Sequence, residues 1–164
     1  MNDKNFARKI LPLSDQLYRF ALSILKDSEN AKDCVQDLFV KMIEKDRRWE
    51  EMDNPKSFLM FVLRNQCIDR LRTTKSHEST DLELVNHAPN PHQKMEQKES
   101  MRMIKQYIGT LPEIQRTIIH LRDIEGLEIA EITEIVSMTE NAVYVNLSRA
   151  RQKIREKLNY LNNK

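Results

Sequence analysis

Glycine scarcity is the feature that most restricts what this chain can fold into, because its 164 residues include only two glycines. Hairpin turns and the loops that cradle nucleotide phosphates need backbone positions at positive φ, which glycine adopts most easily. The composition therefore argues against β-rich folds, dinucleotide-binding folds and P-loops. We expect an all-α protein.

The charge and cysteine content limit the cellular compartments in which such a chain is expected. Charged residues make up 32% of the sequence and its mean hydropathy is -0.65, so no window approaches the roughly 18 apolar residues of a membrane-spanning helix. Cys34 and Cys67 form neither a disulfide framework nor a zinc spacing, and the first residues do not match a secretory signal. These features indicate a cytoplasmic protein without membrane insertion, with reduced thiols and with neither cofactor nor metal.

Apolar residues recur at helical spacing in three segments of the N-terminal half. Asp27 and Ser28 form an N-cap signal before the second segment, and Asn54 followed by Pro55 predicts the start of the third, with proline at the first helical position. We expect residues 1–72 to form one small helical domain. The apolar stripe of the second segment consists of Val35, Leu38, Phe39, Met42 and Ile43.

A break in periodicity separates this domain from a second one. Residues 73–95 lack a helical pattern and contain Pro89 and Pro91, which predicts a flexible linker. Helical spacing resumes in 96–164. Length alone leaves one domain or two undecided, since a domain averages about 150 residues. The linker favours two small helical domains.

The second domain carries a pattern typical of a helix-turn-helix. Gly109 and Gly126 are predicted to stop two helices, and the stretch from Thr110 to Glu113 matches a capping box between them. A short helix at about 129–136, a turn at 137–139 and a long helix from Glu140 follow. The predicted inner face of this motif consists of Ile132, Val136, Met138, Val143 and Leu147.

The outer side of the long helix has the residue types of a DNA-reading surface. Polar and small apolar side chains near its start suit base edges, and cations further along suit phosphates. Basic residues outnumber acidic ones six to two in 140–164, whereas acidic residues dominate 101–139. A helical hairpin with a solvated basic end remains the alternative. The candidate DNA contacts are Glu140, Asn141, Tyr144, Val145, Ser148, Arg149, Arg151 and Lys153.

Two blocks of the sequence resemble bacterial RNA polymerase sigma factors of the extracytoplasmic-function (ECF) class, in the sigma-70 family. The first domain is similar over 17–72, through ENAKDCVQDLFVKM and NPKSFLMFVLRNQCIDRLR. The second is similar over 101–158, through LPEIQRTIIHLRDIEGLEIAEI and VYVNLSRARQKIREKL. The resemblance implies sigma region 2, which binds core polymerase and the minus-ten element, and sigma region 4, which binds the minus-thirty-five element.

The resemblance also implies a polymerase-binding helix at 29–42. In the family this helix docks on the clamp of the largest subunit of core polymerase. Phe39 also lies on the apolar stripe, so it is either a contact or a core residue. The candidate polymerase contacts are Asp33, Gln36, Asp37, Phe39 and Lys41.

The loop at about 46–54 matches the place where the family captures a flipped base of the melted minus-ten element. Capture of a base needs an aromatic or apolar surface and nearby cations. Trp49 is either that surface or a core anchor beside a solvated charge run. The candidate minus-ten contacts are Arg47, Arg48 and Trp49 of the loop, followed by Arg64, Asn65, Asp69, Arg70 and Arg72. Asn65 and Asp69 are either DNA-facing or structural.

Other functions remain as alternatives of different weight. The four histidines have no metal-ligand spacing and no nucleophile accompanies them, so an enzyme is not expected. The resemblance also implies an anti-sigma partner. Residues 144–146 depart from the Lys-Ser-Arg that relatives often carry, which predicts fewer phosphate contacts. A sigma-like interaction protein, or a helix-turn-helix regulator without promoter melting, is therefore the alternative to a sigma factor.

Overall fold

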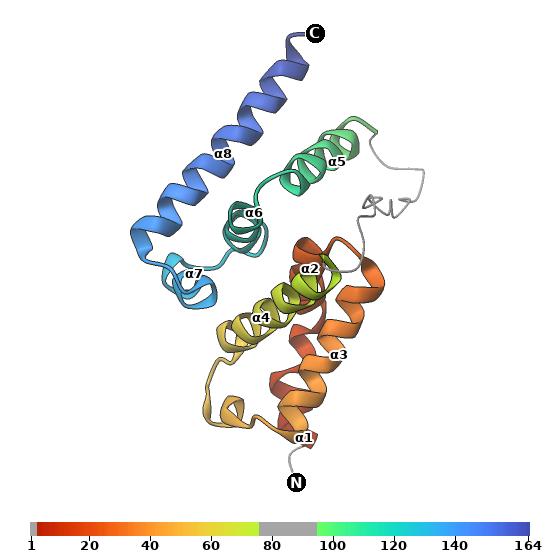
Figure 1. Cartoon of the computed structure of the whole chain (residues 1–164), viewed down its shortest axis with the longest axis vertical. Coiled ribbons are helices and arrows are strands. Elements are labelled where there is room, and N and C mark those ends of the chain that lie inside the picture. The colour runs from red at the N-terminus through yellow and green to blue at the C-terminus, as the bar shows by residue number, and fades with distance from the viewer. Residues whose placement is uncertain (1–2, 76–94) are drawn as a thin grey trace.

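The computed structural model describes residues 3–75 and 95–164, and within these ranges every regular element is a helix (Figure 1). We call residues 3–75 the N-terminal unit and residues 95–164 the C-terminal unit. The all-α expectation with two helical units is confirmed. The N-terminal unit contains α1 (Asp3–Lys9), η1 (Leu11–Leu13), α2 (Ser14–Leu25), α3 (Ser28–Glu44), η2 (Arg48–Glu51) and α4 (Lys56–Lys75), and the C-terminal unit contains α5 (Met95–Gly109), α6 (Glu113–Ile119), η3 (His120–Ile124), α7 (Ile129–Val136) and α8 (Glu140–Asn162).

The ends of two helices bear on the expected linker. Helix α4 continues to Lys75, beyond the expected boundary at residue 72, and α5 begins at Met95. The rest of the predicted linker, 76–94, lies outside the described residues. The domain boundaries therefore remain a prediction.

The N-terminal unit is held by apolar side chains from α2, α3 and α4. Phe20, Leu38 and Leu63 are fully buried between these helices. The predicted cap at Asp27 is present, since its side chain accepts a hydrogen bond from the backbone N–H of Asn30 at 2.7 Å. Lys26, at φ 58°, ends α2 in the left-handed conformation. This short turn folds α3 back against α2.

Two predicted helix starts are displaced. Helix α4 begins at Lys56, and Pro55 precedes it instead of occupying its first position, while the Asn54 side chain accepts from the Lys56 N–H at 3.2 Å. The capping box predicted at Thr110 is wrong. Pro112 is the N-cap of α6 and the Thr110 hydroxyl donates to the carbonyl of Tyr107 at 2.7 Å. The extended backbone of Pro112 ends the preceding turn, so Thr110 lies too early to cap α6.

The helix-turn-helix forms as predicted. Ser137, at φ 55°, ends α7 in the left-handed conformation, and the Thr139 side chain caps α8 by accepting from the Ala142 N–H at 3.2 Å. The unanticipated capping box at the start of α7 pairs Glu128 with Glu131. Ile132, Val136, Val143 and Leu147 are buried as expected, and Met138 is partly buried.

The two units pack against each other, with α4 beside α7 and α2 beside α6 (Figure 1). Arg116 of α6 reaches across this interface and donates to the backbone carbonyls of Ser23 at 2.7 Å and Ile24 at 3.4 Å. These carbonyls belong to the last turn of α2, whose carbonyls lack partners inside the helix. Arg116 therefore caps one unit from the other.

A second set of charged groups lies at the same interface. Arg19 of α2 forms a two-pronged ion pair with Glu125, at 3.0 and 3.2 Å. The Nε2 atom of His120 lies 3.2 Å from the Glu125 carboxylate, and the imidazole stacks on the Phe20 ring with centroids 6.0 Å apart. Burial lowers the pKa of His120 below its ordinary value of 6.5.

Stability is expected to fall as the pH is lowered from above 6.5. In the unfolded chain His120 regains its ordinary pKa, so below pH 6.5 the unfolded state binds the proton more readily than the folded state does. The free energy of unfolding is therefore greatest above that pH and declines toward the lowered pKa of the folded state. Urea unfolding from about pH 5 to 8 measures the decline. His120→Gln should flatten it, and an equally steep profile in the variant would assign the effect to other groups.

Candidate nucleic-acid interface

The exposed face of α3 carries the predicted polar contacts. Asp33, Gln36 and Asp37 are all exposed. Val40 and Ile43, which are 52% and 43% exposed, follow them along the helix at helical spacing. Ile43 was expected on the buried stripe, and that expectation is wrong. Val40 was missed, although its position out of phase with the buried stripe is a signal that the sequence contains.

The other two candidates on α3 lie elsewhere. Phe39 is partly buried, and its ring meets that of Phe6 edge-on with centroids 5.5 Å apart. This position matches the core alternative for Phe39, because contact with α1 covers part of the ring. Lys41 is half-buried and lines a hollow at the end of α3.

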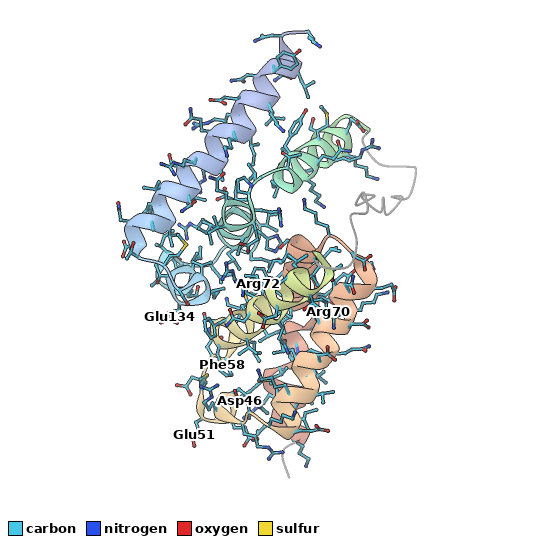
Figure 2. The ribbon with its side chains drawn as sticks, viewed as in Figure 1. Asp46, Glu51, Phe58, Arg70, Arg72 and Glu134 are labelled. Atoms are coloured by element: carbon cyan, nitrogen blue, oxygen red, sulfur yellow. The ribbon has the colours of Figure 1, made fainter. Side chains whose placement is uncertain are left out.

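Arg70 joins two sets of candidates that sequence reasoning had kept apart. Its guanidinium lies 3.0 Å from the carboxylate of Asp37 and 3.8 Å from that of Asp33, where α4 runs beside α3 (Figure 2). The sequence predicts Arg70 as a minus-ten DNA contact and the two aspartates as polymerase contacts. In this structure its charge is balanced by α3.

The connection between α3 and α4, residues 45–55, forms an open hollow of about 660 Å³. Arg48 bonds to the Asp46 carboxylate at 2.6 and 2.9 Å, and its guanidinium lies 5.0 Å from the centroid of the Phe58 ring. Figure 2 labels Asp46, Glu51 and Phe58 in this region. Four of the six residues that line the hollow are cationic, and the Phe58 ring lies beside Arg48 but outside this lining. It is lined by Lys41, Lys45, Asp46, Arg47, Arg48 and Glu51.

Trp49 lies in the core and does not line the hollow. It is 1% exposed, and its indole N–H donates to the backbone carbonyl of Met42 at 2.9 Å. The expectation that Trp49 receives a flipped base does not fit this placement, because no face of the indole is open. The core-anchor alternative fits it. The ring beside Arg48 is that of Phe58, which sequence reasoning missed.

The candidates on α4 divide between the interface and the surface. Arg64 faces the C-terminal unit, where its guanidinium lies 3.4 Å from both carboxylate oxygens of Glu113. Asn65, Asp69 and Arg72 are exposed, and Arg72 lies 4.0 Å from Asp69. Only these three of the five α4 candidates are open to a strand in this structure.

All eight candidates on α8 are exposed, but they do not share one face. A hollow of about 350 Å³ brings Tyr144, Ser148 and Arg151 together with Arg122 and Arg155. Arg122 and Arg155 were missed. Arg155 lies four residues after Arg151, a helical spacing that could have indicated that the two share a face. Arg122 belongs to η3 and lies beside α8 only because of tertiary packing.

Two cations of α8 already have protein partners. Arg151 forms a two-pronged ion pair with Asp123, at 2.6 and 3.0 Å. Lys153 donates to the side-chain oxygen of Gln115 at 3.1 Å, on the side of α8 that faces α6. Lys153 therefore points away from the hollow around Tyr144.

Two features are absent from residues 3–75 and 95–164. No group of three or more metal-ligating side chains occurs there. No helix in the same ranges is long and apolar enough to cross a membrane.

Comparison with protein-family models gives two matches. Residues 10–77 match Sigma-70 region 2, and residues 101–154 match Sigma-70, region 4. The first match begins just after α1 and contains the hollow between α3 and α4. The second contains the helix-turn-helix and the hollow beside α8.

Similar proteins and structures agree with these matches. ECF RNA polymerase sigma factor SigM of Mycobacterium tuberculosis is 29% identical over 147 residues, which span 90% of this chain and 74% of the relative. SigM of Bacillus subtilis is 27% identical, with 86% and 87% coverage. The sigma factor RpoE in complex with the anti-sigma factor NepR, from Bartonella quintana, has the same fold, with a TM-score of 0.80, 24% identity and coverage of 95% and 98%. The chain belongs to the sigma-70 family of bacterial RNA polymerase sigma factors, in the ECF class.

Proposed function

We propose that this sigma factor, which binds core RNA polymerase and directs promoter-specific transcription initiation, divides that work between its two units. The N-terminal unit, with the expected domain 1–72, binds polymerase and the melted minus-ten strand. The C-terminal unit, with the expected domain 96–164, reads minus-thirty-five duplex. The chain acts by binding and catalyses no reaction itself.

The observation that carries the proposal is the exposed recognition helix α8 of a helix-turn-helix. Asn141, Tyr144 and Ser148 lie at its N-terminal end, where a helix in the major groove meets base edges. Arg149 follows them on the exposed surface, and Arg155 lines the same hollow as Tyr144. Cations at that distance along the helix suit the phosphates that flank the groove. Val145 and Glu140 complete the base-reading end.

In the N-terminal unit, the hollow of 45–55 is the proposed site for an unpaired base. Arg47, Arg48 and Lys41 supply positive charge to the backbone of a single strand. The aromatic surface proposed in place of Trp49 is the Phe58 ring, which lies beside Arg48 and outside the lining of the hollow. Asn65, Asp69 and Arg72 extend the path along α4.

The outer face of α3 is the proposed contact with the clamp of the largest polymerase subunit. Asp33, Gln36 and Asp37 present polar groups there, and Val40 and Ile43 add exposed apolar area. Apolar side chains surrounded by polar ones are typical of protein interfaces. Arg70 holds two of these carboxylates in place from α4.

An anti-sigma factor that masks these surfaces is a further proposed partner. Its support is a likeness in fold to two proteins solved with such partners. RpoE was solved in complex with the anti-sigma factor NepR. CnrH, which has a TM-score of 0.66 and 20% identity, with coverage of 97% of this chain and 90% of that one, was solved in complex with the cytosolic domain of CnrY. Because polymerase and promoter DNA are cytoplasmic in bacteria, we place the active protein in the cytoplasm.

Transcription from a promoter library tests the proposal. Core polymerase with the protein should start at new sites that share minus-ten and minus-thirty-five sequences, and core polymerase alone should not. Absence of both new start sites and a core complex would contradict sigma activity. A core complex that selects no promoter would instead favour the sigma-like interaction protein. Binding to duplex DNA without a core complex would favour the helix-turn-helix regulator.

Arg149→Ala is expected to weaken binding to minus-thirty-five duplex and to flatten its salt dependence. Each phosphate contact that is lost should lower the slope of log K against log salt by about 1. Titration of the protein with labelled duplex at several salt concentrations measures the slope. Lys153→Ala is the matched control, because Lys153 faces Gln115 and its loss should leave the slope nearly unchanged. Equal slopes for Arg149→Ala and the unaltered protein would place Arg149 off the DNA.

A further inference from the structure

Helix α1 lies before the segment that matches Sigma-70 region 2, which begins at residue 10. It nevertheless contacts the connection between α3 and α4, at the same end of the N-terminal unit (Figure 1). The contacts join residues more than forty positions apart in the sequence. They are made by two side chains of α1, Phe6 and Lys9.

Lys9 binds the backbone of this connection directly. Its ammonium group donates to the carbonyl of Glu50 at 2.9 Å and to the carbonyl of Met52 at 2.8 Å, in a partly buried position. These carbonyls lie at the end of η2, where a backbone hydrogen bond runs from the Met52 N–H to the Trp49 carbonyl. The Lys9 ammonium group therefore fixes the backbone segment between Trp49 and α4. Bonds of this kind, from a charged donor, are the stronger class of hydrogen bond.

Phe6 holds the same connection from its inner side. Its ring meets Trp49 edge-on with centroids 6.0 Å apart, and meets Phe39 at 5.5 Å. Edge-on aromatic pairs at these distances are favourable. Trp49 is fixed in turn by its bond to the Met42 carbonyl. The connection is therefore anchored on both sides of η2, by Lys9 outside and by the aromatic cluster inside.

The side chains that line the hollow have contacts of their own, since Arg48 bonds to Asp46 and Arg47 donates to the Ile43 carbonyl at 3.2 Å. The backbone that carries them is held in addition by α1. Arg47 and Arg48 belong to the start of η2, and Glu51 to its end. Lys9 lines no part of the hollow itself. Its hydrogen bonds fix the backbone at Glu50 and Met52, on either side of Glu51. They therefore restrict the positions that the η2 side chains lining the hollow can take.

We propose that Lys9 is a positioning residue for capture of the melted strand, and that α1 shapes the hollow for an unpaired base. The inference rests on the proposed function of that hollow. Lys9 touches no DNA and acts through the backbone of 49–52. Without the Lys9 ammonium group, η2 samples other conformations. Binding of a DNA strand must then reorder η2, and the free-energy cost of this ordering lowers the affinity.

Binding of single-stranded DNA by the reconstituted holoenzyme tests the inference. The probe is a fluorescent oligonucleotide with the non-template minus-ten sequence that the promoter library yields. Lys9→Met should weaken its binding about tenfold, an effect on the order of one charge-assisted hydrogen bond. Lys9→Arg, which keeps two donors, should restore most of the affinity. Lys4→Met, at an exposed position of the same helix, is the matched control.

Two further measurements separate positioning from general stability. Affinity for core polymerase should change little in Lys9→Met, because α3 remains in place. The urea unfolding midpoint should fall modestly, because two partly buried carbonyls lose their donor. Equal losses of strand binding and core binding would overturn the inference and make Lys9 a structural residue. Full strand affinity in Lys9→Met, with reduced affinity in Arg48→Ala, would overturn it as well. Full affinity in both variants would contradict the proposed function of the hollow, and the inference with it.

Discussion

Trp49→Ala is expected to lower the free energy of unfolding of the N-terminal unit by about 3–5 kcal/mol, the usual cost of truncating a large buried aromatic residue. The indole is 1% exposed and packs against Phe6, so alanine leaves a cavity. The substitution also leaves the Met42 carbonyl without its indole donor. Urea unfolding followed by circular dichroism measures the loss. Tryptophan fluorescence cannot be used for this variant, because Trp49 is the one tryptophan of the protein. Core binding and strand binding should fall together.

A conservative variant and a surface variant serve as controls for this prediction. Trp49→Phe keeps an aromatic ring but loses the indole N–H and part of the ring volume, so it should cost less than Trp49→Ala. Arg48→Ala should weaken strand binding with little change in stability, because Arg48 is exposed. If Trp49→Ala left stability intact and reduced strand binding alone, the indole would have to be a DNA contact after all.

Arg116→Met is expected to destabilise the packing of the two units by about 2–4 kcal/mol, since it leaves buried acceptors without a donor. The guanidinium donates to Ser23 and Ile24 of the other unit, and to Leu111 at 3.0 Å in its own. Methionine fills similar space but donates no hydrogen bond. Trp49 fluorescence reports the N-terminal unit and circular dichroism reports both. The two unfolding curves should coincide in the unaltered protein and separate in the variant.

Distance measurement gives an independent check of the Arg116 prediction. Fluorophores on exposed Lys32 and exposed Gln152 lie in different units, and their energy transfer should fall in Arg116→Met. Arg149→Met, an exposed substitution in the C-terminal unit, should leave both readouts unchanged. Coincident unfolding curves and unchanged energy transfer in Arg116→Met would show that other contacts hold the units together.

The helices themselves could be predicted because their determinants are local. Apolar spacing located α2, α3 and the helix-turn-helix, and the cap at Asp27 requires only the residues that follow it. The start of α6 was misplaced because Pro112 and Thr110 offer competing local signals. Where two short-range preferences conflict, the sequence pattern does not say which one the fold will satisfy.

The composition of the candidate site was harder to predict because it depends on partners far apart in the sequence. The resemblance to the family located the α3–α4 connection, but the burial of Trp49 follows from packing against Phe6. Arg70 carries a charge that suits DNA, yet its neighbours Asp33 and Asp37 come from another helix. Helical spacing identifies which residues share a face. It does not identify what that face meets.

The position of Arg64 links the packing of the two units to its predicted contact with minus-ten DNA. Its guanidinium lies against Glu113 of α6 while the units are packed, so the same group cannot also neutralise a phosphate of the minus-ten strand. Two mutually exclusive binding events weaken each other by the same factor, whichever occurs first. Strand binding by Arg64, one of the predicted minus-ten contacts, would therefore lower the affinity of the N-terminal unit for the C-terminal unit. The C-terminal unit would then compete for α4 at the high effective concentration of a tethered partner.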